Sequence, residues 1–129
     1  MLTPALPDSS DQLPVDHTLT DQTLVVLCAC PNDDTARRIA ETLVDEHLAA
    51  CVNRMAGVRS TYRWQGRLED EPEVLLLIKT VRRRFEALEL RLKALHPYDL
   101  PEIIALPVIA GSADFLAWVA NETNGSSPR

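Results

Sequence analysis

The sequence predicts an α+β fold in which an antiparallel sheet carries two helices on one face. Three observations lead to this prediction. The apolar runs at residues 23–29 (TLVVLCA) and 72–80 (PEVLLLIKT) are continuous, as is typical of strands buried on both faces. Each run is followed by a segment whose apolar residues recur at helical spacing. Two long strand arms, joined by a Gln-Gly turn, lie between these two helical segments.

The first half of the chain gives a strand, a helix and a long hairpin. After the strand at 23–29, residues Asn32 to Asp34 offer side-chain acceptors for a helix N-terminus. The apolar face of that helix carries Ala36, Ile39, Ala40 and Leu43. The hairpin follows, with arms at residues 50–64 and 67–80.

The second half gives a helix, a strand and a short final helix. A helix is expected over about residues 82–95, and it ends there because Pro97 disfavours helical geometry at His96. Residues 102–108 (EIIALPV) are expected to form the last long strand, and Ser112 to cap a short C-terminal helix. The resulting order, β-α-β-β-α-β with a C-terminal helix, is the ferredoxin-like arrangement.

The chain of 129 residues has the length of one domain. We expect the folded domain to span residues 23–121. Residues 1–22 are rich in Pro, Asp, Ser and Thr without apolar periodicity, so they are expected to form a disordered N-terminal tail, and residues 122–129 a flexible C-terminus.

The hairpin is too long for a small domain. Each arm has about 14 residues, which could extend to roughly 45 Å, whereas a domain of this size has a radius of gyration of about 13 Å. Either a bulge near Met55–Gly57 breaks the arm, or the ribbon overhangs the domain. An overhanging ribbon with Tyr62 and Trp64 near its tip needs a surface to pack on, so we expect a homo-oligomer built by strand edges.

Composition excludes several classes of partner. The formal net charge is −6, so the chain has no excess of positive charge with which to bind nucleic acid. The basic cluster Arg82–Arg84 is interpreted as a solvated first helical turn. No apolar run approaches the roughly 20 residues of a membrane span, and the N-terminus lacks the pattern of a signal peptide. Three cysteines, an odd number, fit a reducing compartment, so the protein is expected to be cytoplasmic.

Two cysteines suggest a metal site. Cys28 and Cys30 lie two apart on a strand, so both thiols point to one side, where they could bind a soft metal such as Cu(I). The alternative, favoured for Cys28 and Cys51, is that cysteine is a small buried hydrophobe. Cys30, at the end of the strand, is expected to be the more accessible thiol.

Four further residues are candidates for binding. His96 is either a helix C-cap or a ligand, and its local sequence does not separate the two. Lys79 ends a buried strand, so it is expected to reach a carboxylate, with Glu102 as a candidate, or a ligand anion. Tyr98 and Trp64 are amphipathic and suit a cleft or an interface.

Three segments in order carry a family resemblance: LAACVN, YRWQGRLEDEPEVLLLIKT, and LHPYDLPEIIALPV followed by GSADFLAWV. They resemble the CutA divalent-ion tolerance family over about residues 23–121. The resemblance implies a ferredoxin-like subunit in a tight homotrimer similar to the PII signalling proteins, with sheets extended between subunits. It also implies a link to copper and divalent-metal tolerance.

The resemblance further implies particular metal ligands. Some members of that family are assigned copper ligands at a cysteine ending the first strand and at two adjacent histidines before Pro-Tyr. These positions correspond to Cys28 and, for the second histidine, to His96, whereas the first histidine falls on Leu95. We therefore expect this chain to bind copper more weakly than a two-histidine site does.

Three functions compete on the sequence alone. The first is a trimeric cytoplasmic protein that binds copper or another divalent cation at Cys28 and His96. The second is a PII-like module that binds a small anion in intersubunit clefts lined by Trp64, Lys79, Tyr98 and Glu102. The third, ranked last, is an enzyme with a Cys or His nucleophile, because no Ser-His-Asp pattern or paired-carboxylate motif is present.

Overall fold

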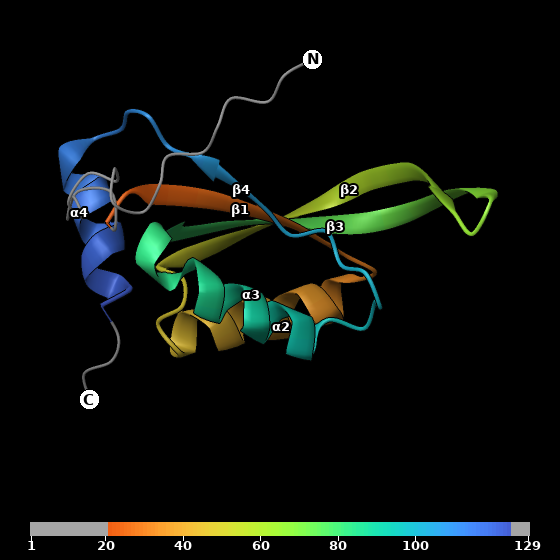
Figure 1. Ribbon diagram of the computed structural model, residues 1–129, viewed down its shortest axis with the longest axis horizontal. Helices are drawn as coiled ribbons and strands as arrows, with labels where there is room; N and C mark the ends of the chain where they lie inside the picture. Colours follow the sequence, from red (N-terminus) through yellow and green to blue (C-terminus); the bar gives the residue numbers. More distant parts are fainter. Residues whose placement is uncertain (1–20, 125–129) are drawn as a thin grey trace, which may run out of the picture.

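The computed structural model describes residues 21–124 and has a four-stranded antiparallel sheet at its centre, with strand order β2-β3-β1-β4 (Figure 1). This order and the helix placement confirm the predicted ferredoxin-like α+β fold. The elements are β1 (Thr23–Cys30), α2 (Asp33–Asp45), β2 (Cys51–Trp64), β3 (Arg67–Val81), a 3-10 turn η2 (Arg82–Arg84), α3 (Phe85–Leu95), β4 (Ile104–Pro107) and α4 (Ala113–Glu122).

Helices α2 and α3 cover one face of the sheet, and the core lies between them and the strands (Figure 1). Alternation along a strand sends every second side chain to this face. On β1 these are Val26, Cys28 and Cys30, which lie opposite Ile78, Leu76 and Val74 of β3. The helices contribute Ile39, Leu43, Leu88 and Leu92, and all of these side chains are buried.

The opposite face of the sheet is also aliphatic. Val25 and Leu27 of β1 and Leu75 and Leu77 of β3 lie on it and are half-buried. The exposed fraction is 49% for each of Met55, Ile104 and Leu106. A soluble domain rarely leaves so many aliphatic side chains in contact with water on one surface, which marks this face as a candidate interface.

The hairpin β2–β3 extends past the ends of α2 and α3 (Figure 1). Its turn is Gln65-Gly66, with φ values of 51° and 79°, as a two-residue type I′ hairpin turn requires. The register shifts between Met55 and Val58, where Gly57 has a φ of 82°. Both expected features are therefore present, because a bulge interrupts the arm and the ribbon still overhangs the domain.

Two elements differ from their predicted bounds. The last strand pairs only over Ile104–Pro107, opposite Leu27–Leu24 of β1, and not over residues 102–108. Pro101 and Pro107 flank this region, and a proline has no N–H to donate to a ladder. The second helix begins with the 3-10 turn at Arg82–Arg84 and becomes α-helical at Phe85.

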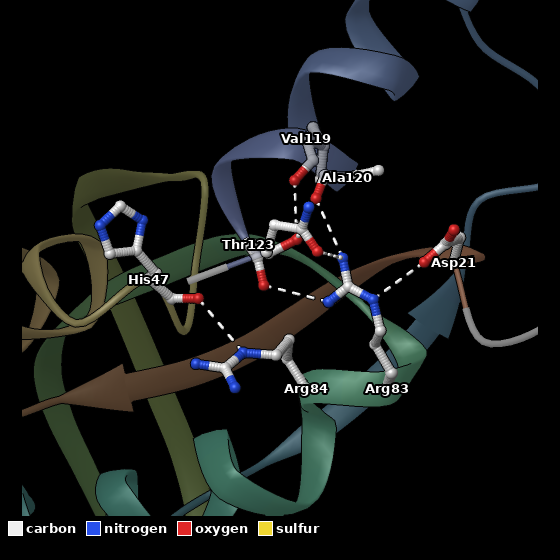
Figure 2. Close-up of polar contacts among 8 residues, drawn as sticks. Asp21, His47, Arg83, Arg84, Val119, Ala120 and Thr123 are labelled. Carbon is white, nitrogen blue, oxygen red and sulfur yellow. Dashed lines mark hydrogen bonds and ion pairs between the residues drawn. The ribbon is translucent and has the colours of Figure 1, made fainter. Parts of the chain in front are cut away.

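The turn Arg82–Arg84 has no buried residue, as the interpretation of a solvated turn requires, but two of its side chains also bond to backbone carbonyls. Figure 2 shows the guanidinium of Arg83 between Asp21 and the end of α4, where it donates to the carbonyls of Ala120 and Thr123, both at 3.0 Å. Arg84 donates to the His47 carbonyl at 3.3 Å. Helix α4 has no basic residue in its own last turn, so Arg83 supplies the positive charge that a helix C-terminus favours.

The described fold reaches slightly beyond residues 23–121 at both ends. Asp21 pairs with Arg83, and the Gln22 carbonyl accepts a hydrogen bond from the Arg82 amide. Thr123 is fully buried, and its hydroxyl donates to the Val119 carbonyl at 2.8 Å. The expectations for residues 1–20 and 125–129 lie outside the described residues. Within residues 21–124, no helix is both long and apolar enough to cross a membrane.

We predict that Arg83→Met destabilises the protein and that Arg82→Met does not. The first change removes two charged hydrogen bonds to helix-end carbonyls, a loss of about 1–3 kcal/mol, reduced by the 27% exposure of the Arg83 side chain. Among residues 21–124, the one hydrogen bond of the Arg82 side chain is to the half-buried Gln22 side chain, at 3.3 Å. Thermal unfolding by circular dichroism at equal protein concentration compares them, and equal melting temperatures for the two variants would contradict the capping role.

Candidate functional site

Two thiols and one imidazole meet beneath the end of the first strand. Cys28 and Cys30 point to the helix-covered face of β1, and His96 is the C-cap residue of α3. One potential ligand atom from each of the three residues lies within 4.8 Å of the others, and all three residues are buried. We call Cys28, Cys30 and His96 the thiol-imidazole cluster.

Both ring nitrogens of His96 are engaged in hydrogen bonds. The Tyr98 backbone amide donates to Nδ1 at 3.1 Å, so Nδ1 is unprotonated. Nε2 then carries the proton of the neutral ring and donates to the Ala29 carbonyl at 2.7 Å. The ring also stacks at a tilt against Tyr98, with 4.7 Å between ring centroids. His96 is therefore a structural link, and a metal ion at either nitrogen must displace one hydrogen bond.

The two thiols differ in acidity. The Cys28 thiol donates a hydrogen bond to Cys30, and this bond together with burial raises the pKa of Cys28 far above its usual range. The same hydrogen bond, helped by His96, lowers the pKa of Cys30 against the effect of burial. For His96, burial lowers the pKa, but Cys30 and the Ala29 carbonyl outweigh it, so the net shift is upward. Cys30 is therefore the thiol that ionises first.

A cleft of about 660 Å³ lies next to this cluster, on the other side of Ala29. Its walls are the outer part of the hairpin, residues 60–64 together with Glu73, and the connection from α3 to β4, residues 98–102. The Tyr98 hydroxyl donates to Glu73 Oε2 at 2.8 Å and so joins the two walls. Burial, and next this bond to Glu73, raise the pKa of Tyr98 well above its usual range, which keeps the phenol a donor.

A family model described as "CutA1 divalent ion tolerance protein" matches residues 24–122, nearly all of the described chain. The chain belongs to the CutA1 divalent ion tolerance family. The "Divalent-cation tolerance protein CutA" of Thermus thermophilus is 50% identical over 99 residues, which are 77% of this chain and 96% of that protein. The rice "Protein CutA 1, chloroplastic" is 41% identical over 83% of this chain and 60% of its own length.

Solved structures of CutA proteins share the fold. The Thermus thermophilus Cut A1 structure superposes with a TM-score of 0.76 at 48% identity, covering 78% of this chain and 97% of that one. The structure titled "Periplasmic divalent cation tolerance protein CutA from Archaeoglobus fulgidus" superposes with a TM-score of 0.76 at 32% identity, covering 78% and 98%. The resemblance noted in the sequence is therefore confirmed.

The structure brings most of the predicted site residues of this CutA family chain into two groups. Cys28 and His96 lie together in the thiol-imidazole cluster, whereas Trp64, Tyr98 and Glu102 line the cleft. The sequence did not identify Glu73, a buried carboxylate in the cleft wall. Its only sequence signal is an acidic residue placed directly before a continuous apolar run.

One expectation about site residues is wrong, and a second residue, Lys79, lies away from this cleft in the single chain. Cys30 is fully buried and not the accessible thiol, because α2 and α3 cover the end of β1 as well as its middle. Lys79 does not line the cleft, and among residues 21–124 it makes no ion pair with Glu102 or any other carboxylate. Lys79 is six residues along β3 from Glu73, a separation of about 20 Å in a strand.

We predict that His96→Ala destabilises the protein even when all metal is removed. The change leaves the buried Ala29 carbonyl and the Tyr98 amide without their partners, a loss of about 2–4 kcal/mol. His96→Gln, whose amide can still donate towards Ala29, should recover part of this loss. Denaturant unfolding with a strong chelator present measures both variants at one protein concentration. An unchanged midpoint for His96→Ala would show that the two hydrogen bonds of the ring do not stabilise the fold.

Proposed function

We propose that this protein serves divalent-cation tolerance as a homotrimer that binds copper, as Cu(I), at the thiol-imidazole cluster. The observation that supports this proposal is the convergence of two thiol sulfurs and an imidazole nitrogen within 4.8 Å in a buried setting. Thiolates are soft donors that favour Cu(I), and imidazole also suits copper. Membership of the divalent ion tolerance family gives the biological setting.

The residues present fit such an ion. Cys30, with its lowered pKa, would bind as a thiolate first, and binding would then release the proton of Cys28. His96 would complete the site only by giving up its bond to Ala29 or to Tyr98. The two thiols therefore carry most of the affinity in this proposal, and Leu95 provides no second imidazole. A bound Cu(I) ion would supply a soft, positively charged centre to the end of β1.

The homotrimer rests on two surfaces that the single chain leaves uncovered. One is the aliphatic sheet face with Met55, Ile104 and Leu106. The other is the hairpin, whose strand β2 is an edge of the sheet, as β4 is the opposite edge. Edge strands of neighbouring copies can pair and extend a sheet, so both surfaces fit the intersubunit arrangement that the family resemblance implies.

We place the protein in the cytoplasm, where thiols stay reduced. Its three described cysteines are free, and the proposed Cu(I) site needs Cys28 and Cys30 in that state. The compartments of relatives differ, since a rice relative is named chloroplastic and an archaeal one periplasmic, and those names apply to those proteins. A binding role is proposed in preference to catalysis, since the family description names ion tolerance and no reaction.

The small-anion alternative is not favoured by the cleft. Glu73, Asp99 and Glu102 place three acidic residues in its lining, against one basic residue, Arg63. Lys79, the residue expected to hold an anion, lies elsewhere on β3. An anion in this cleft would meet like charges, which raises its binding free energy.

We predict that Cu(I) binds at one ion per chain and that the binding depends on both clustered cysteines. Cys28→Ser and Cys30→Ser should each weaken binding at least 100-fold, because a hydroxyl replaces a soft thiolate donor. Cys51→Ser and Lys79→Ala are matched controls outside the cluster and should bind as the parent does. Anaerobic competition against a chromogenic Cu(I) chelator measures the affinities. Parent-like binding by Cys30→Ser, or submicromolar Cu(II) binding that survives His96→Ala, would contradict the site.

We predict that Trp64→Ala weakens assembly more than Trp118→Ala. The two tryptophans are 41% and 42% exposed, so they are matched in residue type and accessibility but lie near the hairpin tip and on α4. Trp118 is on the C-terminal helix, and its ring contacts the ring of Phe115 with 5.7 Å between the centroids. Burying the exposed part of Trp64, roughly 100 Å², contributes about 2–3 kcal/mol gross per subunit. Sedimentation over a dilution series decides, and equal dissociation of both variants would place the tip outside the interface.

A further inference from the structure

The cleft between the hairpin and residues 98–102 has a strong charge imbalance. Glu73, Asp99 and Glu102 are three acidic residues of its lining and Arg63 is the one basic residue, so the lining residues carry a formal net charge of −2. The thiol-imidazole cluster lies on the other face of β1 and contributes no residue to this cleft. The thiol-imidazole cluster therefore takes no direct part in recognising a ligand of this cleft.

Glu73 is the most constrained of these carboxylates. It is 8% exposed and accepts one hydrogen bond from Tyr98, and within residues 21–124 it forms no ion pair. Burying a carboxylate costs free energy unless a positive charge compensates it. Since no side chain of the described chain supplies that charge, the arrangement calls for a cation from outside.

Three aromatic side chains complete the walls: Tyr62, Trp64 and Tyr98, each between 37% and 41% exposed. The face of an aromatic ring attracts a cation, and a tryptophan ring does so most strongly. The ring surfaces also offer apolar contact to a hydrocarbon chain. Carboxylates and aromatic rings together suit an ammonium ion that carries an aliphatic part.

We propose that this cleft binds an aliphatic diamine or polyamine, with one ammonium group at Glu73 and a second towards Glu102 and Asp99, and with its hydrocarbon chain against the rings of Tyr62 and Tyr98. The net charge of −2 matches a dication. The volume of about 660 Å³ lies within the range of small-molecule sites, far above what a single metal ion fills.

A metal ion suits the cleft less well than an extended cation. Among residues 21–124, the thiol-imidazole cluster is the only group of three or more His, Cys, Asp or Glu side chains with ligand atoms close enough to share an ion. The carboxylates of the cleft do not form such a group. Burial raises the pKa of Tyr62, and the charges of Glu71, Glu69 and Glu73 raise it further. The negative charge near the cleft therefore also acts on Tyr62.

The test follows the fluorescence of Trp64 in full-length protein carrying Trp118→Phe, so that one tryptophan remains. Titration with 1,5-diaminopentane or spermidine should give a saturable change that weakens as sodium chloride is added. The uncharged diacetyl derivative of the diamine should give none. Glu102→Gln, at an exposed position that does not endanger folding, and Glu73→Gln, which retains an acceptor for Tyr98, should each weaken binding about ten-fold or more.

Asp114→Asn is the matched control, because Asp114 lies on α4 outside the cleft and should bind the diamine as the parent does. Cys30→Ser should also bind it normally, which separates this inference from the copper site. No saturable response up to about 10 mM diamine, or parent-like affinity in both glutamine variants, overturns the proposal. So does an equal response to Mg²⁺ alone, which would make the cleft a metal site, or to inorganic phosphate, which would restore the anion reading.

Discussion

The hydrogen bond from His96 to the Ala29 carbonyl joins the end of α3 to the end of β1, and both candidate sites depend on it. On one side of this bond, the imidazole is held beside Cys28 and Cys30. On the other side, the second ring nitrogen orients the Tyr98 amide, and the Tyr98 hydroxyl then reaches Glu73 across the cleft. One residue at a helix end therefore sets the geometry of a metal-type cluster and of a ligand cleft.

This shared residue puts folding and metal binding in competition. A histidine with free nitrogens binds a metal without loss, but here each nitrogen already satisfies a buried backbone group. An ion that takes Nε2 leaves the Ala29 carbonyl unpaired, and an ion that takes Nδ1 leaves the Tyr98 amide unpaired. The contribution of His96 to any metal affinity would be the difference between a coordination bond and a lost hydrogen bond, so the architecture makes this contribution small.

Much of the fold could be read from the sequence because its signals are local. Asn32 and Ser112 cap the helices as their positions predict, with Asn32 accepting from the Thr35 amide and Ser112 from the Phe115 amide. The spacing of the apolar residues and two prolines were sufficient to predict the order of strands and helices. The family could be recognised because its motifs occur in order within this one sequence.

The parts that were missed depend on tertiary contacts. The role of Arg83 could not be predicted, because the carbonyls to which it donates belong to the end of α4, about 40 positions further along the chain. Cys30 was taken as accessible because the strand ends there, whereas the depth of a strand end depends on which helices pass over it.

The bulge between Met55 and Val58 changes which side chains of β2 lie on which face of the hairpin. Before it, odd-numbered residues of β2 share a face with Leu75 and Leu77, and after it the even-numbered residues, Tyr62 and Trp64 among them, share a face with Glu69 and Glu73. Without the extra residue, Thr61 and Arg63 would take that face and both aromatic rings would turn to the other side. One extra residue near Gly57 thus decides whether this face of the ribbon carries aromatic or polar side chains. Deleting one residue there would exchange the side chains of the two faces, although the rest of the sequence stayed the same.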